Sequence, residues 1–247
     1  MKKVFVLILC LTILLVNGCA SSGVKFVQSI PDARKVLVMS FLGDNLNLEL
    51  IGTTVFNNKH DAADVGIWSI DDAIEMSFSE NVTSRFALVR AKSIPFRKDV
   101  GQLKSEGFTN YILKLRDHKT KIYDLARSEK ADYILIFSTY NSTDDKFRTS
   151  VSYEGYGVLQ RSIFGISRSV IYACVCSTVL DVASEQQVAR GCDVKYQEFP
   201  EKNPLDSIPA IKNDLRYLNK DDFVKLISTV AKWTSKAIGI HSTEINQ

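Results

Sequence analysis

The stretch SRSVIYACVCSTVLDV, residues 167–182, decides the fold of this 247-residue chain. It is rich in β-branched and apolar residues, and such a run is typical of one long β-strand. The turn segment SEQ (184–186) separates it from QVARGCDVKYQEF (187–199), and the loop SIFGI (162–166) separates it from TSVSYEGYGVLQR (149–161). The three segments predict a three-stranded antiparallel meander with long strands.

Working outward, the rest of the chain alternates between strand and helix patterns. Ser69, followed three residues later by Asp72, predicts the amino-terminal cap of a helix. Gly43, Asp44 and Asn45 predict a turn that joins the strands before and after it into a hairpin. The predicted strands are 35–44, 46–58, 85–91 and 131–140, and the predicted helices are 70–86, 120–130 and 219–240.

The last helix has the clearest amphipathic pattern. Asn219 or Asp221 is its predicted cap, and its apolar face is predicted to consist of Phe223, Leu226, Ile227, Val230, Trp233 and Ala237. The order of elements predicts an α/β (α+β) fold: a single domain whose mixed sheet contains a long antiparallel meander, closed by a C-terminal amphipathic helix.

The amino terminus has the pattern of an export signal. Lys2 and Lys3 precede an apolar run, residues 4–16, broken only by Thr12. As a helix this run would cover roughly 20 Å, which is short of the ~30 Å hydrocarbon core of a bilayer. Removing residues 1–18 lowers the formal net charge from +3 to +1, so no basic excess indicates a nucleic-acid partner.

The residues Val16-Asn17-Gly18-Cys19 resemble the lipobox of bacterial lipoprotein signals: aliphatic, variable, small, then cysteine. The resemblance implies cleavage before Cys19, two acyl chains on its sulfur and a third on its amine. An uncleaved anchor or a plain secretory signal is the alternative. Ala20, rather than aspartate, implies the outer membrane, facing the periplasm; the cell surface or the inner membrane is the alternative.

These patterns divide the chain into four parts. We expect a signal peptide at 1–18, a lipidated tether at 19–34, a periplasmic α/β domain at 35–240 and a tail at 241–247. The order of helix, ADYILIF strand, long hairpin and terminal helix resembles periplasmic domains of the curli-secretion lipoprotein, penicillin-binding-protein activator lipoproteins and the TolB amino-terminal domain. No specific family is matched residue for residue.

Three cysteines of the mature chain lie in the meander. If the turn centres on Ser184, Cys176 lies directly opposite Cys192, within the Cα distance that a disulfide requires. An oxidising periplasm permits this candidate disulfide. The alternative is that Cys174, Cys176 and Cys192 are three buried free thiols.

The loop RSIFGIS, residues 161–167, is more apolar than a solvent-facing turn usually is. Either Ile163, Phe164 and Ile166 fold back onto the domain, or they form a partner-contact loop.

The sequence shows no motif of catalytic chemistry. We therefore expect no catalytic residue, no metal ligand and no cofactor. The expected function is a non-catalytic binding or accessory protein, anchored to the membrane by its lipid, whose partner is an envelope protein. The alternative is an oligomeric component of a secretion or surface-assembly system, and an envelope hydrolase is the least favoured choice.

Overall fold

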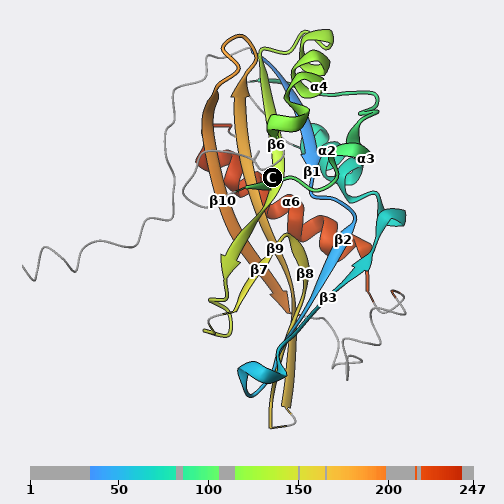
Figure 1. Ribbon diagram of the computed structural model, residues 1–247. Helices are drawn as coiled ribbons and strands as arrows, with labels where there is room; N and C mark the ends of the chain where they lie inside the picture. The colour runs from blue at the N-terminus through green and yellow to red at the C-terminus, as the bar shows by residue number, and fades with distance from the viewer. Residues whose placement is uncertain are drawn as a thin grey trace, which may run out of the picture.

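A computed structural model describes residues 34–81, 86–105, 115–149, 151–164, 166–198, 215 and 218–240. It is a mixed α/β single domain with a mixed sheet and a C-terminal helix (Figure 1), as the sequence predicts. The strands are β1 (Lys35–Phe41), β2 (Asn45–Ile51), β3 (Lys59–Asp64), β4 (Ala87–Arg90), β5 (Lys104–Ser105), β6 (Tyr133–Thr143), β7 (Ser152–Glu154), β8 (Tyr156–Ile163), β9 (Ile166–Asp181) and β10 (Gln187–Glu198).

The sheet is organised around β9 and branches along its length. One edge of β9 pairs with β10 through residues 170–180 of β9. The other edge pairs with β6 through residues 175–181 and with β8 through residues 166–173. Outside β6 lie β1 and then β4, whereas outside β8 lie β2 and then β3. The strand order in one half of the sheet is therefore β10-β9-β6-β1-β4, and in the other half β10-β9-β8-β2-β3.

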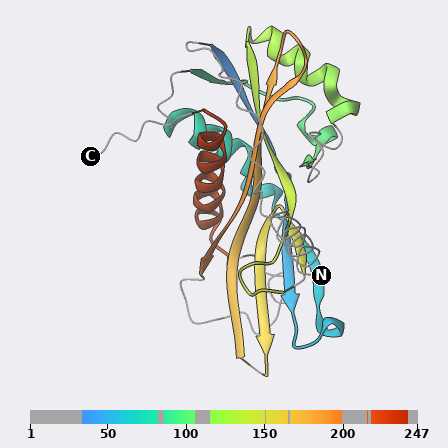
Figure 2. The ribbon, with the colours of Figure 1, turned by 90° about the vertical axis from the view of Figure 1, so that its left-hand side faces the viewer.

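Helices cover both faces of the sheet. They are α2 (Ile70–Asn81), α3 (Arg97–Val100), α4 (Leu115–Ser128) and α6 (Lys220–Ala237), with short 3-10 turns η1 (Val55–Asn57) and η2 (Gly66–Trp68). Figure 2 shows α2 and α6 on one side and α4 on the other. The side chains of α2 and α6 share a buried cluster with β1, β2 and β9, and those of α3 and α4 share a second one.

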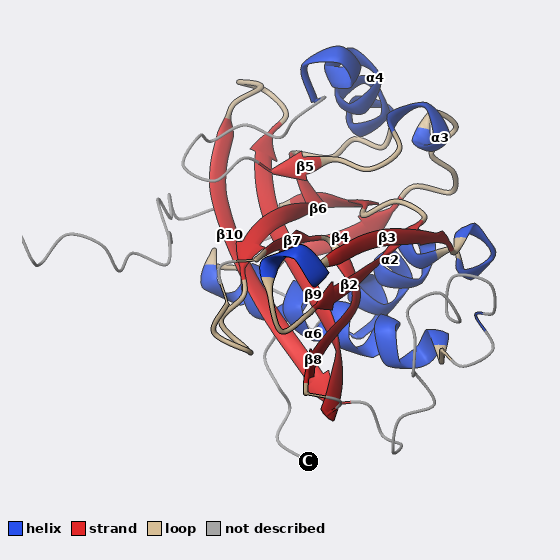
Figure 3. Cartoon of the chain, turned by 60° about the horizontal axis from the view of Figure 1, so that its bottom comes forward, coloured by secondary structure: helices blue, strands red, loops and turns tan. Residues whose placement is uncertain are grey.

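A third buried cluster lies under the loop between β6 and β7. Phe147 and Tyr153 pack there against Leu159 and Tyr172. Figure 3 shows β7 and the nearby strands from below.

The predicted hairpin of the first two strands is wrong. β1 and β2 do not pair with each other; β1 pairs in parallel with β4 and β6, and β2 with β8. Val36 and Val38 of β1 and Leu46 and Leu48 of β2 all lie in the cluster beneath α2 and α6. The two strands therefore follow one another along the sheet and do not fold back into a hairpin, because both bury their apolar side chains on the face covered by α2 and α6. The true hairpin partner of β2 is β3, whose polar sequence gave no strand signal.

Two local expectations are also corrected. Ser69 has the left-handed φ of 47° and ends η2, so it lacks the extended conformation of a helix cap. Asn219 does cap α6, accepting a hydrogen bond from the Asp221 N–H. Trp233 is 57% exposed, because the buried face of α6 continues through Thr234 and Ser235, whose hydroxyls hydrogen-bond with that of Ser177.

Candidate functional site

The end of β1 is held by two buried carboxylates of α2. β4 pairs with β1 only as far as Val38, so among the described residues the N–H groups beyond it have no strand partner on that side. The Ser40 N–H donates to Glu75 Oε1 (2.7 Å), and the Leu42 N–H donates to Asp71 Oδ1 (2.7 Å). Asp71 and Glu75 are one helical turn apart, a spacing close to that of alternate residues along a strand. The two carboxylates thus replace the missing strand.

Arg97 of α3 closes this arrangement. Its guanidinium donates to Asp72 Oδ1 and to Glu75 Oε1, each at 2.5 Å. Burial raises the pKa of Glu75 to about 7, although the attraction of Arg97 opposes the rise. Burial also raises the pKa of Asp71, against the hydrogen bonds that its carboxylate accepts. Burial alone would lower the pKa of Arg97, but the surrounding carboxylates raise it overall.

A cleft of about 420 Å³ lies beside this network. Its lining includes Gly43, Asp44, Asp72, Lys98 and Gln102. Asp71 and Arg97 also line it, and the Asp71 carboxylate accepts hydrogen bonds from the backbone N–H groups of Leu42 and Gly43. Over the described part of the chain, no group of three or more His, Cys, Asp or Glu side chains could hold a metal ion. We therefore interpret the network as a structural contact that holds α2, α3 and β1 together, and we call Asp71, Glu75 and Arg97 the latch.

The predicted partner-contact loop lies at one end of the sheet, between β8 and β9. Ile163 pairs with Ile166, so Phe164 belongs to a two-residue connection. Its side chain is 89% exposed, so the alternative that this residue folds back onto the domain is wrong. The side chains of Ile163 and Ile166 lie outside what the structure describes.

The backbone at Phe164 is strained. Its φ is 48°, in the left-handed region where bulky residues are uncommon and where two-residue hairpin loops prefer asparagine or glycine. A non-glycine residue there costs roughly 1–2 kcal/mol. An exposed aromatic side chain is therefore held where it gains no packing and costs backbone energy, an outlier that points to function.

A second exposed aromatic side chain lies beside this loop, and the sequence analysis missed it. Phe56, in η1 of the β2–β3 connection, is 94% exposed. The two connections are neighbours because Ile51 of β2 pairs with Arg161 of β8, and the Thr53 hydroxyl donates to the Ser162 carbonyl at 3.5 Å. Figure 1 shows both at the lower end of the sheet. We call the two connections, residues 52–58 and 161–167, the hairpin tips. The available signal was an aromatic residue within the turn-rich segment GTTVFNN.

The cysteines of the meander lie in the arrangement that the turn at Ser184 implies. Cys176 pairs with Cys192 across β9 and β10, with Cα atoms 4.0 Å apart, and a disulfide joins them. Cys174 is buried and free, and burial raises the pKa of its thiol well above the ordinary value. The disulfide therefore ties the long hairpin at its middle, away from the tips.

The other predicted site lies elsewhere. Cys19 falls outside the described residues, so its lipidation stays a prediction. None of the helices described is long and apolar enough to cross a membrane.

Comparisons with known proteins assign the chain to no family. It matches no protein-family model and no curated protein. Similar solved structures include a PelC dodecamer from Paraburkholderia phytofirmans, with 12% identity, 88% of this chain and 96% of that chain covered, and a TM-score of 0.34. The LpoB C-terminal domain from Salmonella enterica has 13% identity, with 69% of this chain and 88% of that chain covered and a TM-score of 0.30. Lipoprotein GNA1162 from Neisseria meningitidis has 13% identity, with 69% of this chain and 88% of that chain covered and a TM-score of 0.34. With TM-scores this low, the likenesses carry no functional argument.

Proposed function

We propose that the protein is an outer-membrane-anchored lipoprotein that faces the periplasm and binds another cell-envelope component without catalysis. The observation that carries the proposal is the pair of aromatic side chains, Phe56 and Phe164, exposed at 94% and 89% on the hairpin tips. Paired strands hold both tips, so the two rings are presented without an ordering cost at binding.

The carboxylates near the cleft support a non-catalytic role. A general acid or base must reach a substrate, but Asp71 and Glu75 accept hydrogen bonds from the β1 backbone. Their raised pKa values follow from burial. The polar network that most resembles an active site therefore has a structural explanation.

Photo-crosslinking in cells tests the proposal. Phe164 is replaced by the photoreactive analogue benzoylphenylalanine, and adducts are collected from isolated envelopes. We expect an adduct with an envelope component, protein or lipid, and none from the same analogue at Ile67, which is 86% exposed but lies on η2. Equal adducts at both positions, or none at position 164, would contradict a contact through the tips.

The alternative, a self-assembling component of a secretion system, gives a different outcome. In that case the adduct at position 164 is a dimer of this chain, and size-exclusion chromatography of residues 24–247 shows one discrete large species. A monomer with a heterologous adduct supports the accessory role.

A further inference from the structure

We propose that the hairpin tips bind the surface of an anionic lipid bilayer, with Phe56 and Phe164 inserted among the headgroups and the basic residues around them at the phosphates. The inference rests on the proposed function in one respect, the tips being the contact surface, and it names the component that they meet.

The tips and the residues beside them carry an excess of positive charge. Three segments at this end of the sheet, residues 50–59, 146–149 and 161–168, contain five lysines and arginines and no acidic residue, and Asp144 and Asp145 precede the second segment. They are Lys59, Lys146, Arg148, Arg161 and Arg168. Arg161 lies directly opposite Arg168 across β8 and β9, and it donates to the Phe147 carbonyl oxygen at 2.7 Å. Glu198 of β10 pairs with Lys146 and Arg168. A net positive surface attracts anionic headgroups.

The area that the two aromatic rings can bury is small. A fully buried aromatic side chain removes about 150–250 Å² from water, so two rings supply well below the ~800 Å² that a stable protein interface buries on each partner. Aromatic side chains and flanking lysines and arginines are, by contrast, the residues that proteins place at a membrane–water interface, where apolar burial and attraction to anionic lipid act together. A bilayer therefore fits the tips better than a protein surface does.

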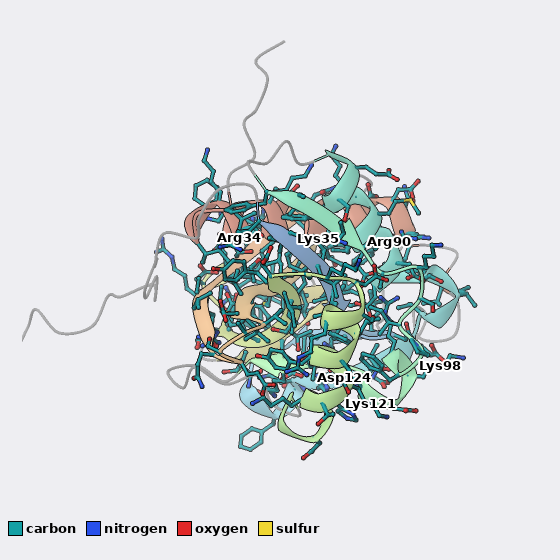
Figure 4. The ribbon with its side chains drawn as sticks, turned by 90° about the horizontal axis from the view of Figure 1, so that it is seen from above. Arg34, Lys35, Arg90, Lys98, Lys121 and Asp124 are labelled. Carbon is teal, nitrogen blue, oxygen red and sulfur yellow. A yellow bond between two sulfur atoms is a disulfide. The ribbon has the colours of Figure 1, made fainter. Side chains whose placement is uncertain are left out.

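The length of the segment between Cys19 and the domain is comparable with the length of the sheet. The described chain begins at Arg34, at the end of the sheet opposite to the tips; Figure 4 views the molecule from that end and labels Arg34 and Lys35. Residues 20–33, fully extended, span roughly 50 Å, and the path of β1 and β2 along the sheet is about 55 Å. The extended tether is slightly shorter than this path, so a lipid on Cys19 and the two tips reach the same bilayer when the long axis of the sheet is tilted toward the bilayer surface.

Vesicle binding tests the proposal. Residues 20–247 carry no acyl group but include every described residue, and their binding is measured by co-sedimentation with phosphatidylcholine vesicles, with and without phosphatidylglycerol. We expect binding only to the anionic vesicles, weakened by added salt. Lys59→Gln should weaken it about fivefold, and Phe56→Ser tenfold or more. Ile67→Ser, an exposed apolar site at the other end of the β2–β3 hairpin, should have no effect.

Phe164→Asn separates the lipid contact from folding. Asparagine tolerates the left-handed conformation, so this variant should unfold at higher urea concentration than the wild type and yet bind anionic vesicles at least tenfold more weakly. Absence of binding by the wild type, or binding that the tip substitutions leave unchanged, overturns the inference. If that occurs while position 164 crosslinks to a protein, the proposed function stands and its partner is a protein; if no adduct forms, both fall.

Discussion

Glu75→Gln should make the protein more stable above neutral pH and remove part of its pH dependence. The pKa of Glu75 is raised from 4.5 to about 7 in the folded state. Between these values the folded protein binds more protons than the unfolded chain, so the free energy of unfolding falls as the pH rises through this window. The whole interval corresponds to about 3 kcal/mol. Glutamine resembles the neutral carboxyl, and its amide oxygen can still accept from the Ser40 N–H.

The measurement is urea unfolding of the wild type and the variant at pH 4.5, 6 and 8. The stability of the variant relative to the wild type should rise by about 3 kcal/mol from the lowest to the highest pH, whatever its value at the start. Glu80→Gln, an exposed position on the same helix, is the matched control and should show no such rise. A difference that stays constant with pH, or that moves in the opposite direction, would refute the burial argument for Glu75.

Three further predictions follow from other parts of the molecule. Denatured residues 20–247 should show one reactive thiol without reductant and three with it, and three thiols without reductant would exclude the disulfide. Cys192→Ser should lower the free energy of unfolding by about 3 kcal/mol, because the disulfide closes a loop with a sequence separation of 16. Cys19→Ala should leave the precursor unprocessed or release the protein from membranes, and unchanged processing and fractionation would exclude lipidation. Gly157→Ala should lower the free energy of unfolding by at least about 2 kcal/mol in urea, since its Cβ would lie 2.0 Å from the Asn47 carbonyl oxygen of β2; a smaller loss would show that the two strands can separate.

Much of the fold was predictable because its strands and helices bury continuous apolar runs. The antiparallel order of β8, β9 and β10, and the register that sets Cys176 opposite Cys192, follow from strand lengths and one short turn. The C-terminal helix follows from its period and its Asn219 cap. The branch of the sheet was not predictable, because pairing between β2 and β8 joins segments far apart in sequence. Local turn residues at Gly43 indicated a hairpin, and the shared core overrode them.

The latch of α2 and the exposed Phe56 were missed for different reasons. Asp71 has the position of an ordinary helix-start acid, and its carboxylate binds the backbone of β1 because, within the described ranges, β4 stops pairing with β1 at Val38. Phe56 was interpreted as the end of a strand, since nothing in its neighbourhood showed that β2 stops at Ile51. Phe164 was identified because an apolar turn is unusual by itself. Sequence patterns reveal unusual residues, whereas their neighbours depend on tertiary pairing.

The latch and the tips are joined by one continuous strand path. Asp71 and Glu75 fix the last residues of β1, and the chain then passes through Gly43, whose carbonyl accepts from the Tyr156 hydroxyl at 2.7 Å, directly into β2. β2 is paired on both sides, by β3 and β8; one tip joins β2 to β3, and the other joins β8 to β9. Both tips are therefore held by paired strands that continue into the buried core. Such a rigid mount suits a surface that binds through two side chains, because little of the binding free energy is lost in ordering them.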